Sequence, residues 1–268
     1  MAQKVEKFSS GRFAGAFFLL RDIILRILPL PRRTHILIAC LPKSGSTFLA
    51  EAMGTLSGLR RFRLTPAWGA REQELCQIRL SRANHIDYVA QHHLCNSEWT
   101  QQLVANYNVS TVVLLRNLSD CVVSVCDHLR REPQRSPMSY FTPEQVSAMT
   151  DEQLQEAVVR FVMPWYINFC MGWLRETRAL FISYEDVASN PAVAIAEILK
   201  YAGAAYTSEG IEAALQKVQE KRTRFNVGVV GRGRGLCPAA AKELSRMLDF
   251  YPEIKNDSRL VRPDDFTL

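Results

Sequence analysis

A short polar segment, Lys43 to Thr47, follows a short apolar run, residues 34–41, with the sequence THILIACL. Where a buried strand turns tightly into a helix, backbone N–H groups point outward and the helix N-terminus favours negative charge. Gly45 lets the backbone approach an anion closely, Lys43 supplies a positive charge, and Ser46 and Thr47 supply hydroxyl donors. The segment is therefore a candidate phosphate site, and a plain strand-to-helix connection is the alternative.

The order of residues in this loop differs from that of the nucleoside triphosphate loop, GxxxxGK[ST]. The lysine, Lys43, precedes Gly45 instead of following a glycine directly. The sequence also shows no obvious acidic residue after a strand that would hold Mg²⁺. A magnesium-dependent kinase acting on a small substrate is therefore disfavoured, and it is kept as an alternative.

A second candidate anion site follows the apolar run at residues 110–116, STVVLLR. Arg116 ends this predicted strand, at the edge where α/β sheets bind ligands. Ser124 comes eight residues later, about two turns into the helix predicted over residues 118–131. The arginine fork and the hydroxyl could share one phosphate. Alternatively, Arg116 pairs with Asp120 and Ser124 is an ordinary buried serine.

Two adjacent histidines, His92 and His93, end a further predicted strand at residues 87–93. Histidine titrates near neutral pH, so it is suited to removing a proton from a reacting group. The alternative for such a pair is a structural or surface role.

Strands and helices alternate along the chain, which predicts an α/β fold with a central parallel sheet flanked by helices. The predicted strands are residues 34–41, 87–93, 110–116 and 178–184. The predicted helices are residues 46–57 and 118–131, with a third beginning at Asn190-Pro191. A loop is predicted over residues 132–143, and one long helix, kinked at Pro164, over residues 151–177. The first strand, its polar turn and its helix form a P-loop-like phosphate-binding unit.

The length of 268 residues and the 47% hydrophobic content suit one large α/β domain. A net charge of +6 and a pI of about 9.0 imply an anionic partner without identifying it. The seven cysteines include no CxxC pair, and their number is odd. Buried free thiols are therefore favoured over disulfides or a zinc site.

Residues 1–33 are predicted to form an N-terminal extension, in part an amphipathic helix, before the domain at residues 34–268. No apolar run in it reaches the roughly 18–20 residues that a spanning helix needs, and no small-residue cleavage site marks a signal peptide. Its arginines could meet anionic lipid head groups, which predicts peripheral membrane contact through residues 12–31 at the cytoplasmic face. Packing against the domain's own surface is the alternative, and a cytoplasmic location is predicted either way.

The two anion motifs resemble those of the sulfotransferase family that uses 3′-phosphoadenosine 5′-phosphosulfate (PAPS). The family's Pro-Lys-Ser-Gly-Thr-Thr-Trp loop corresponds to PKSGSTF here, and its Arg-Asn-Pro-x-Asp motif with a following serine corresponds to RNLSDCVVS. The resemblance implies that the loop binds the 5′-phosphosulfate, with Lys43 near the bridging oxygen. It also implies that Arg116 and Ser124 hold the 3′-phosphate. The implied loop ligands are Lys43, Ser44, Gly45, Ser46, Thr47 and Phe48.

Residues 222–234 resemble the family's segment Arg-Lys-Gly-x-x-Gly-x-Trp-Lys, which reaches the 3′-phosphate. Gly228 and Gly231 match its glycines, whereas Gly233 stands in place of its tryptophan and its Arg-Lys pair is missing. Charge could come instead from the arginines of the segment, which are Arg222, Arg224, Arg232 and Arg234. A flexible basic loop is the alternative. In the stretch FISYEDV, the resemblance places Tyr184 near the adenine.

The family usually shows Lys-[Thr/Ser]-His-Leu around its catalytic base, and this chain shows Gln91-His92-His93-Leu94. Alignment on the His-Leu step implies that His93 takes the acceptor's proton, with His92 as the alternative base or as an orienting partner. Because some sulfotransferases use a carboxylate, four acidic residues also stay candidates: Glu51, Glu72, Glu74 and Asp87.

The sequence thus predicts an enzyme that moves a sulfuryl group from PAPS to a hydroxyl or amine by in-line displacement, without a metal. A basic, apolar N-terminus suits a lipid, glycolipid or glycan acceptor, with a small molecule as the other class; nucleic acid is not expected. Trp68 and the aromatic stretch at residues 161–173 are candidate linings of the acceptor cleft. The alternatives are the small-molecule kinase and a non-enzymatic basic membrane-binding module. The latter would leave the ordered motifs unexplained.

Overall fold

The computed structural model describes residue 20 and residues 33–56, 58–66, 74–132, 139–220 and 229–266. Most of the predicted N-terminal extension therefore lies outside the described residues. So do several residues named above, which are Trp68, Glu72, Arg222, Arg224 and Gly228.

A five-stranded sheet forms the centre of the molecule, with the order β2-β3-β1-β4-β5 and parallel pairing throughout. The strands are β1 (His35–Cys40), β2 (Arg60–Arg61), β3 (Tyr88–His92), β4 (Ser110–Leu115) and β5 (Leu180–Ser183). All but β2 were predicted, because strands buried on both faces are continuous apolar runs. The two exposed arginines of β2 carry no such signal.

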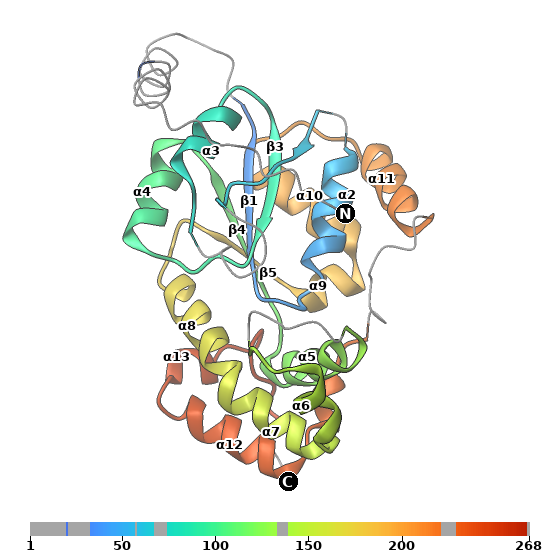
Figure 1. Cartoon of the computed structure of the whole chain (residues 1–268). Coiled ribbons are helices and arrows are strands. Elements are labelled where there is room, and N and C mark those ends of the chain that lie inside the picture. The colour runs from blue at the N-terminus through green and yellow to red at the C-terminus, as the bar shows by residue number, and fades with distance from the viewer. Residues whose placement is uncertain are drawn as a thin grey trace.

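Helices cover both faces of the sheet and gather beyond one end of it (Figure 1). In Figure 1, α2, α10 and α11 lie on one side of the sheet, and α3 and α4 lie on the other. The first helices are α2 (Ser46–Thr55), α3 (Gln77–Ala83), α4 (Glu98–Asn106), α5 (Leu118–Arg131), α6 (Pro143–Ala148), α7 (Asp151–Phe161) and α8 (Met163–Leu174). The later ones are α9 (Tyr184–Ser189), α10 (Pro191–Tyr201), α11 (Ser208–Glu220), the 3₁₀ helix η2 (Arg232–Gly235), α12 (Pro238–Leu248) and α13 (Pro252–Lys255).

The sheet separates two apolar cores, because successive side chains of a strand point to opposite faces. Ile36 and Ile38 of β1 belong to the core shared with α2, α10 and α11. Leu37 and Ala39 belong to the larger core, to which α5, α7, α8 and α12 contribute. Burial on both faces holds β1 rigidly, so the loop that follows it starts from a fixed point.

The predicted long helix over residues 151–177 is instead two helices, α7 and α8. Proline has no N–H for the helical ladder and clashes with the preceding turn, so it fits only the first turn of a helix. Pro164 lies in the first turn of α8, and Val162 caps both helices. The proline therefore begins a new helix and does not kink a continuous one.

A short helix that was not predicted, α9, turns the chain directly after β5. The Ser183 hydroxyl accepts a hydrogen bond from the Asp186 amide at 3.0 Å, and the Asp186 carboxylate accepts one from the Ser183 amide at 3.1 Å. This reciprocal capping box starts a helix within one residue. Tyr184 is the first residue of α9, so the start of this helix sets the position of the Tyr184 side chain.

All seven cysteines are free thiols, and those in the core are Cys40, Cys121, Cys126 and Cys170. Burial raises the pKa of Cys121 and of Cys126 to about 12, so both stay protonated at neutral pH. Within the described part of the chain, no helix has the length and apolar character needed to cross a membrane.

Candidate active site at the carboxyl edge of the sheet

Because the strands are parallel, the residues that follow their carboxyl ends lie along one edge of the sheet. β1 leads to Lys43, β3 to His93, β4 to Arg116 and β5 to Tyr184. Four segments that are far apart in the sequence therefore place their predicted functional residues at the same edge.

The loop after β1 has the shape of an anion site. Gly45 has a φ of 76° and Lys43 a φ of 64°, both in the left-handed region that directs backbone N–H groups outward. The buried Ser44 hydroxyl donates to the Leu41 carbonyl at 2.6 Å and so closes the turn. The N-cap of α2 is Gly45, which has no side chain to cap the helix, and the first turn of α2 has no acidic residue. The helix dipole at this end is therefore available to a bound anion.

Two aromatic side chains hold this loop in place. The Tyr166 hydroxyl on α8 donates to the Pro42 carbonyl at 3.0 Å. The Tyr184 ring lies against Gly45 so closely that a Cβ at Gly45 would be 3.0 Å from the Cε2 atom of the ring. The glycine is therefore needed both for its φ and for this contact.

Arg116 joins the two predicted anion motifs. Its Nη1 atom donates to the Lys43 carbonyl at 2.5 Å, and its guanidinium carbon lies 4.1 Å from the centre of the Tyr184 ring. The side chain is buried, and its Nε atom has no hydrogen-bond partner among the described residues. The hydroxyl of Ser119, in the first turn of α5, is also buried without a partner among them. Ser124, five residues further along α5, is also buried.

Asp120 does not pair with Arg116, which answers the alternative raised from the sequence. Its carboxylate accepts the amides of Gly231 at 2.9 Å and Gly233 at 2.7 Å, and pairs with Arg262 at 2.5 Å. Burial alone would raise the pKa of Asp120, but the Arg262 and glycine hydrogen bonds hold it below its usual value. Asp120 therefore attaches the glycine-rich segment to α5.

The glycine-rich segment packs tightly on the start of α5. A Cβ at Gly233 would be 2.5 Å from the Ser119 Cβ, so the close packing requires a glycine at this position. Gly231 has a φ of 85°, which favours glycine. Arg232 forms an ion pair with Asp127 of α5, three residues beyond the end of the second motif. Gly228, the other matched glycine, is outside the described residues.

The two adjacent histidines have different surroundings. His93 is half-buried, and its Nδ1 lies 3.0 Å from the Cys40 carbonyl oxygen and 3.4 Å from the Cys40 sulfur. His92 is buried, and its Nε2 accepts the Leu64 amide at 3.0 Å. Burial, and then the nearby charges of Arg63, His93 and Arg79, lower the pKa of His92 to about 3. His92 is thus a neutral structural acceptor at ordinary pH.

The carboxylate candidates lie in other places. Asp87 precedes β3, at the amino edge of the sheet, where it bonds Arg33 and the Thr34 amide. Glu51 on α2 pairs with Arg61 at 3.4 Å. Glu74 is exposed. None of these three described residues is among the groups that follow the strand ends.

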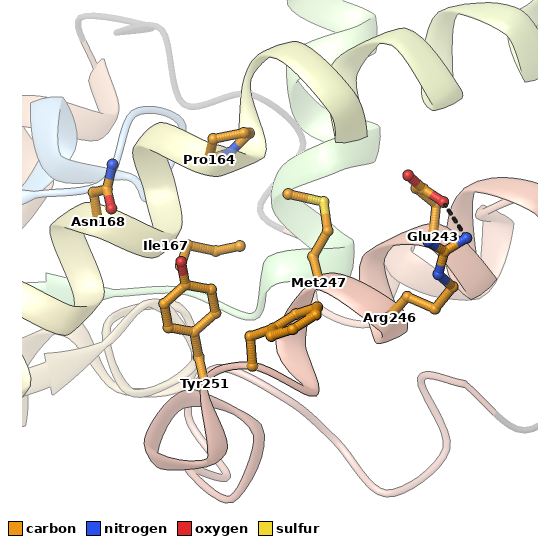
Figure 2. A pocket seen from close by; sticks show the side chains of 8 residues that line it. Pro164, Ile167, Asn168, Glu243, Arg246, Met247 and Tyr251 are labelled. Atoms are coloured by element: carbon orange, nitrogen blue, oxygen red, sulfur yellow. Dashed lines mark ion pairs between the residues drawn. The ribbon is translucent and has the colours of Figure 1, made fainter.

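The aromatic stretch at residues 161–173 is mostly core. Tyr166, Phe169 and Trp173 are fully buried, and the Trp173 indole donates to the Leu94 carbonyl at 2.8 Å. A cavity of about 280 Å³ lies between α8 and α12 (Figure 2). It is lined by Pro164, Ile167, Asn168, Glu243, Arg246, Met247, Phe250 and Tyr251. At about 100° per residue, Pro164 and Asn168 lie on the side of α8 opposite Tyr166, so this cavity faces away from the phosphate loop.

Sequence reasoning missed the C-terminal residues of the site. Leu260 and Arg262 bond the start of α5, although no motif marks them. Their only sequence signal is an Arg-x-x-Asp spacing, Arg262 to Asp265, which forms a local ion pair at 3.0 Å and is too common to identify a site. Among the described residues, no group of three or more histidine, cysteine or acidic side chains could hold a metal ion.

Comparison with known proteins agrees with this arrangement. Residues 33–227 match the family described as the sulfotransferase domain. The structure resembles the mouse sulfotransferase SULT7A1 complexed with PAP, with a TM-score of 0.61 and 18% identity over 85% of this chain and 87% of that one. It also resembles retinol dehydratase in complex with androsterone and the inactive cofactor PAP, with a TM-score of 0.57 and 16% identity over 92% and 88%. Among curated protein sequences, no significant match was found.

The family match covers most of the chain, and the structural likenesses show the same fold. The chain therefore belongs to the sulfotransferase family, as its two anion motifs predicted, and it is an enzyme of that class.

Proposed function

We propose that this sulfotransferase takes its sulfuryl group from PAPS and transfers it to a hydroxyl or amine acceptor. The observation that carries the proposal is the bond from Arg116 to the Lys43 carbonyl, because it joins the candidate 5′-phosphate loop to the buried guanidinium of Arg116. One nucleotide with phosphates at both ends of its ribose fits such a pair of sites. The solved structures of similar fold that are complexed with PAP support this choice.

The chain offers suitable groups to both phosphates. The uncapped start of α2, Lys43 and the exposed Thr47 would hold the 5′ end. The Nε atom of Arg116 and the hydroxyl of Ser119 are buried donors without partners among the described residues, and a 3′-phosphate would satisfy them. Ser124 and Arg232 complete this second site in the proposal, and Tyr184 lies beside the adenine.

His93 is the proposed base. A carbonyl oxygen can only accept, so the 3.0 Å contact with Cys40 fixes the proton of a neutral His93 on Nδ1. The lone pair is then on Nε2, which can take the acceptor's proton as the new O–S or N–S bond forms. PAPS supplies the sulfuryl group when bound, and Lys43 stabilises the negative charge left on the departing phosphate. His92 has a structural role in this proposal.

We infer the class of acceptor from the composition of the N-terminal sequence. Basic and apolar residues at positions 12–31 would place the enzyme on anionic lipid at the cytoplasmic face of a membrane, where a lipid, glycolipid or glycan acceptor is presented. Sedimentation with anionic liposomes, comparing the whole chain with one lacking residues 1–31, tests this part. Equal sedimentation of the two chains would exclude membrane contact through this segment.

The cofactor is tested by calorimetric titration with 3′-phosphoadenosine 5′-phosphate (PAP) and with ATP, without metal. We expect tight binding of PAP, little binding of ATP, and loss of PAP binding in Arg116→Ala. Ser124→Ala leaves the bond between Arg116 and Lys43 intact and should weaken PAP binding about tenfold through one lost phosphate hydrogen bond. A Mg²⁺-dependent preference for ATP would overturn the proposal in favour of a kinase.

A further inference from the structure

We infer that Arg262, near the C-terminus, is a positioning residue of the 3′-phosphate site. The inference rests on the proposed function, and it extends the site beyond the part of the chain that matches the family, residues 33–227. Arg262 acts through the groups it holds, which are the start of α5 and the glycine-rich segment.

The first step is what Arg262 contacts. Its Nη2 atom donates to Asp120 at 2.5 Å and to the side-chain oxygen of Asn117, the N-cap of α5, at 2.9 Å. Its Nε donates to Asp265 at 3.1 Å. Asp265 also accepts a hydrogen bond from the Asn117 side-chain amide at 2.5 Å. Asp265 and Asn117 therefore contact each other as well as the guanidinium of Arg262.

The second step is what Asp120 does for the pocket. Asp120 is fully buried and holds the amides of Gly231 and Gly233, and Arg232 between them reaches Asp127 on α5. An unpaired carboxylate at this position would repel a phosphate bound nearby, and a protonated one could accept less strongly from two amides. Arg262 keeps the Asp120 carboxylate ionised and offsets part of the negative charge of Asp120 and Asp265, with which it forms ion pairs. It therefore keeps the glycine-rich segment on α5 with less repulsion toward a phosphate bound nearby.

The third step is why a ligand is implicated at this point. Ser119 precedes Asp120, and its buried hydroxyl lacks a partner among the described residues. Its Cβ lies 2.5 Å from the position that a Cβ on Gly233 would take. The buried Nε atom of Arg116 also lacks a partner among the described residues. Arg116 directly precedes Asn117, the N-cap of α5 that Arg262 contacts. Arg262 thus holds the start of α5, where both of these unpartnered donors lie.

The test compares PAP with adenosine 5′-phosphate, which lacks the 3′-phosphate, by calorimetry on Arg262→Gln. We expect the Kd for PAP to rise about tenfold or more, because a buried charge-assisted bond is lost, while the Kd for adenosine 5′-phosphate stays unchanged. The matched control is Arg259→Gln. Arg259 lies in the same segment, pairs with Asp257 at 2.5 Å and lies over the Phe181 ring, away from Asp120.

Each outcome decides the inference. An equal loss for both nucleotides, or an equal effect of Arg259→Gln on PAP, would overturn it and leave Arg262 a general stabilising residue. If Arg262→Gln does not fold, Arg262→Lys keeps the charge but loses the fork, and an unchanged PAP affinity in that variant would also overturn it. Failure of the unsubstituted protein to bind PAP at all would instead refute the proposed function.

Discussion

At the scale of single residues, the two adjacent histidines illustrate how position in a strand separates roles. His92 ends β3 and bonds the Leu64 amide inside the protein, whereas His93 lies just beyond the strand, next to the end of β1. The sequence motif alone kept both as candidate bases. Because the two histidines differ in burial and in hydrogen bonding, we expect substitution of His93 to affect catalysis and substitution of His92 to affect stability.

Replacing His93 with Gln should lower kcat by about 10² to 10⁴, because the group that takes the acceptor's proton is lost. The Kd for PAP should stay unchanged, since His93 has no assigned contact with the nucleotide. Single-turnover kinetics with saturating donor, together with calorimetry, measure the two effects. A kcat near that of the unsubstituted enzyme would remove His93 from the mechanism.

Replacing His92 should affect stability before chemistry. His92→Leu leaves the buried Leu64 amide without its acceptor, which should cost about 1–3 kcal/mol in the free energy of unfolding. In His92→Gln the side-chain oxygen can still reach that amide, so a smaller loss is expected. Denaturant unfolding measures both variants. Equal losses in the two would contradict the role assigned to the Leu64 bond.

The buried carboxyl group of Glu185 should make the free energy of unfolding depend on pH. Both of its carboxylate oxygens are buried with no hydrogen-bond partner among the described residues. Burial raises the pKa of Glu185, and the charge of Asp120 adds to this rise, whereas its own backbone amide and the charges of Arg116 and Arg262 oppose it. A carboxyl whose pKa is raised by folding stabilises the protein fully only below its unfolded pKa, about 4.3, and that stability is lost as the pH rises through the folded pKa.

Glu185→Gln should therefore raise the free energy of unfolding at pH 8 by about 1 kcal/mol, because a neutral amide costs less to bury than a carboxylate. The gain should shrink as the pH falls toward 4. Denaturant titrations at several pH values measure it, with the exposed Glu209→Gln on α11 as the control. A gain that does not depend on pH would show that the charge of Glu185 is not the cause.

At the scale of elements, the turn into α2 decides whether the phosphate loop forms. Gly45→Ala places a Cβ at a φ of 76° and 3.0 Å from the Tyr184 ring, whereas Gly203→Ala has a similar φ of 66° with nothing within 4 Å. Gly203→Ala should cost about 1 kcal/mol of unfolding free energy from backbone strain alone. Gly45→Ala should cost more and should also weaken PAP binding at least tenfold. Similar PAP affinity in both variants would mean that the loop does not contact the nucleotide.

The elements that could be predicted from the sequence are those whose signal runs through the whole element. Buried strands and the helix over residues 118–131 are continuous patterns of composition, and the structure has that helix with the same bounds. The break between α7 and α8 and the short helix α9 depend on one proline and one capping box. Each of these signals spans only a few residues, so a prediction from the composition of longer stretches missed both features.

In the candidate site, the motif residues could be predicted and the contacts between motifs could not. The motif residues are neighbours in sequence, so Lys43, Arg116 and His93 could be named in advance. Their connections are long-range: Arg116 reaches back 73 residues to Lys43, and Arg262 reaches 142 residues to Asp120. No local pattern encodes a partner at such a separation, so the joining of the two motifs and the C-terminal arginine emerge only from the fold.

At the scale of the whole molecule, the segment beyond the family match completes the larger core. Leu260 is fully buried in this core, together with apolar side chains of α12 and α13. Its carbonyl accepts the Leu118 amide at 2.8 Å, so the end of the chain is fastened to the start of α5. We therefore expect the helices beyond residue 229 to belong to the same folding unit as the sheet.

A chain ending at Glu220 should fail to unfold cooperatively, because it exposes the core surface that α12, α13 and Leu260 cover. Leu260→Ala is the milder form of the same change. It keeps the backbone bond to α5 and should cost about 2–5 kcal/mol of unfolding free energy from the cavity it leaves. Val193→Ala on α10, where the side chain is 59% exposed, should change the same quantity by less than about 0.5 kcal/mol. Thermal and denaturant unfolding compare the three. Cooperative unfolding of the shortened chain with a midpoint near that of the full chain would show that residues 33–220 fold alone and that the C-terminal helices only pack against a finished domain.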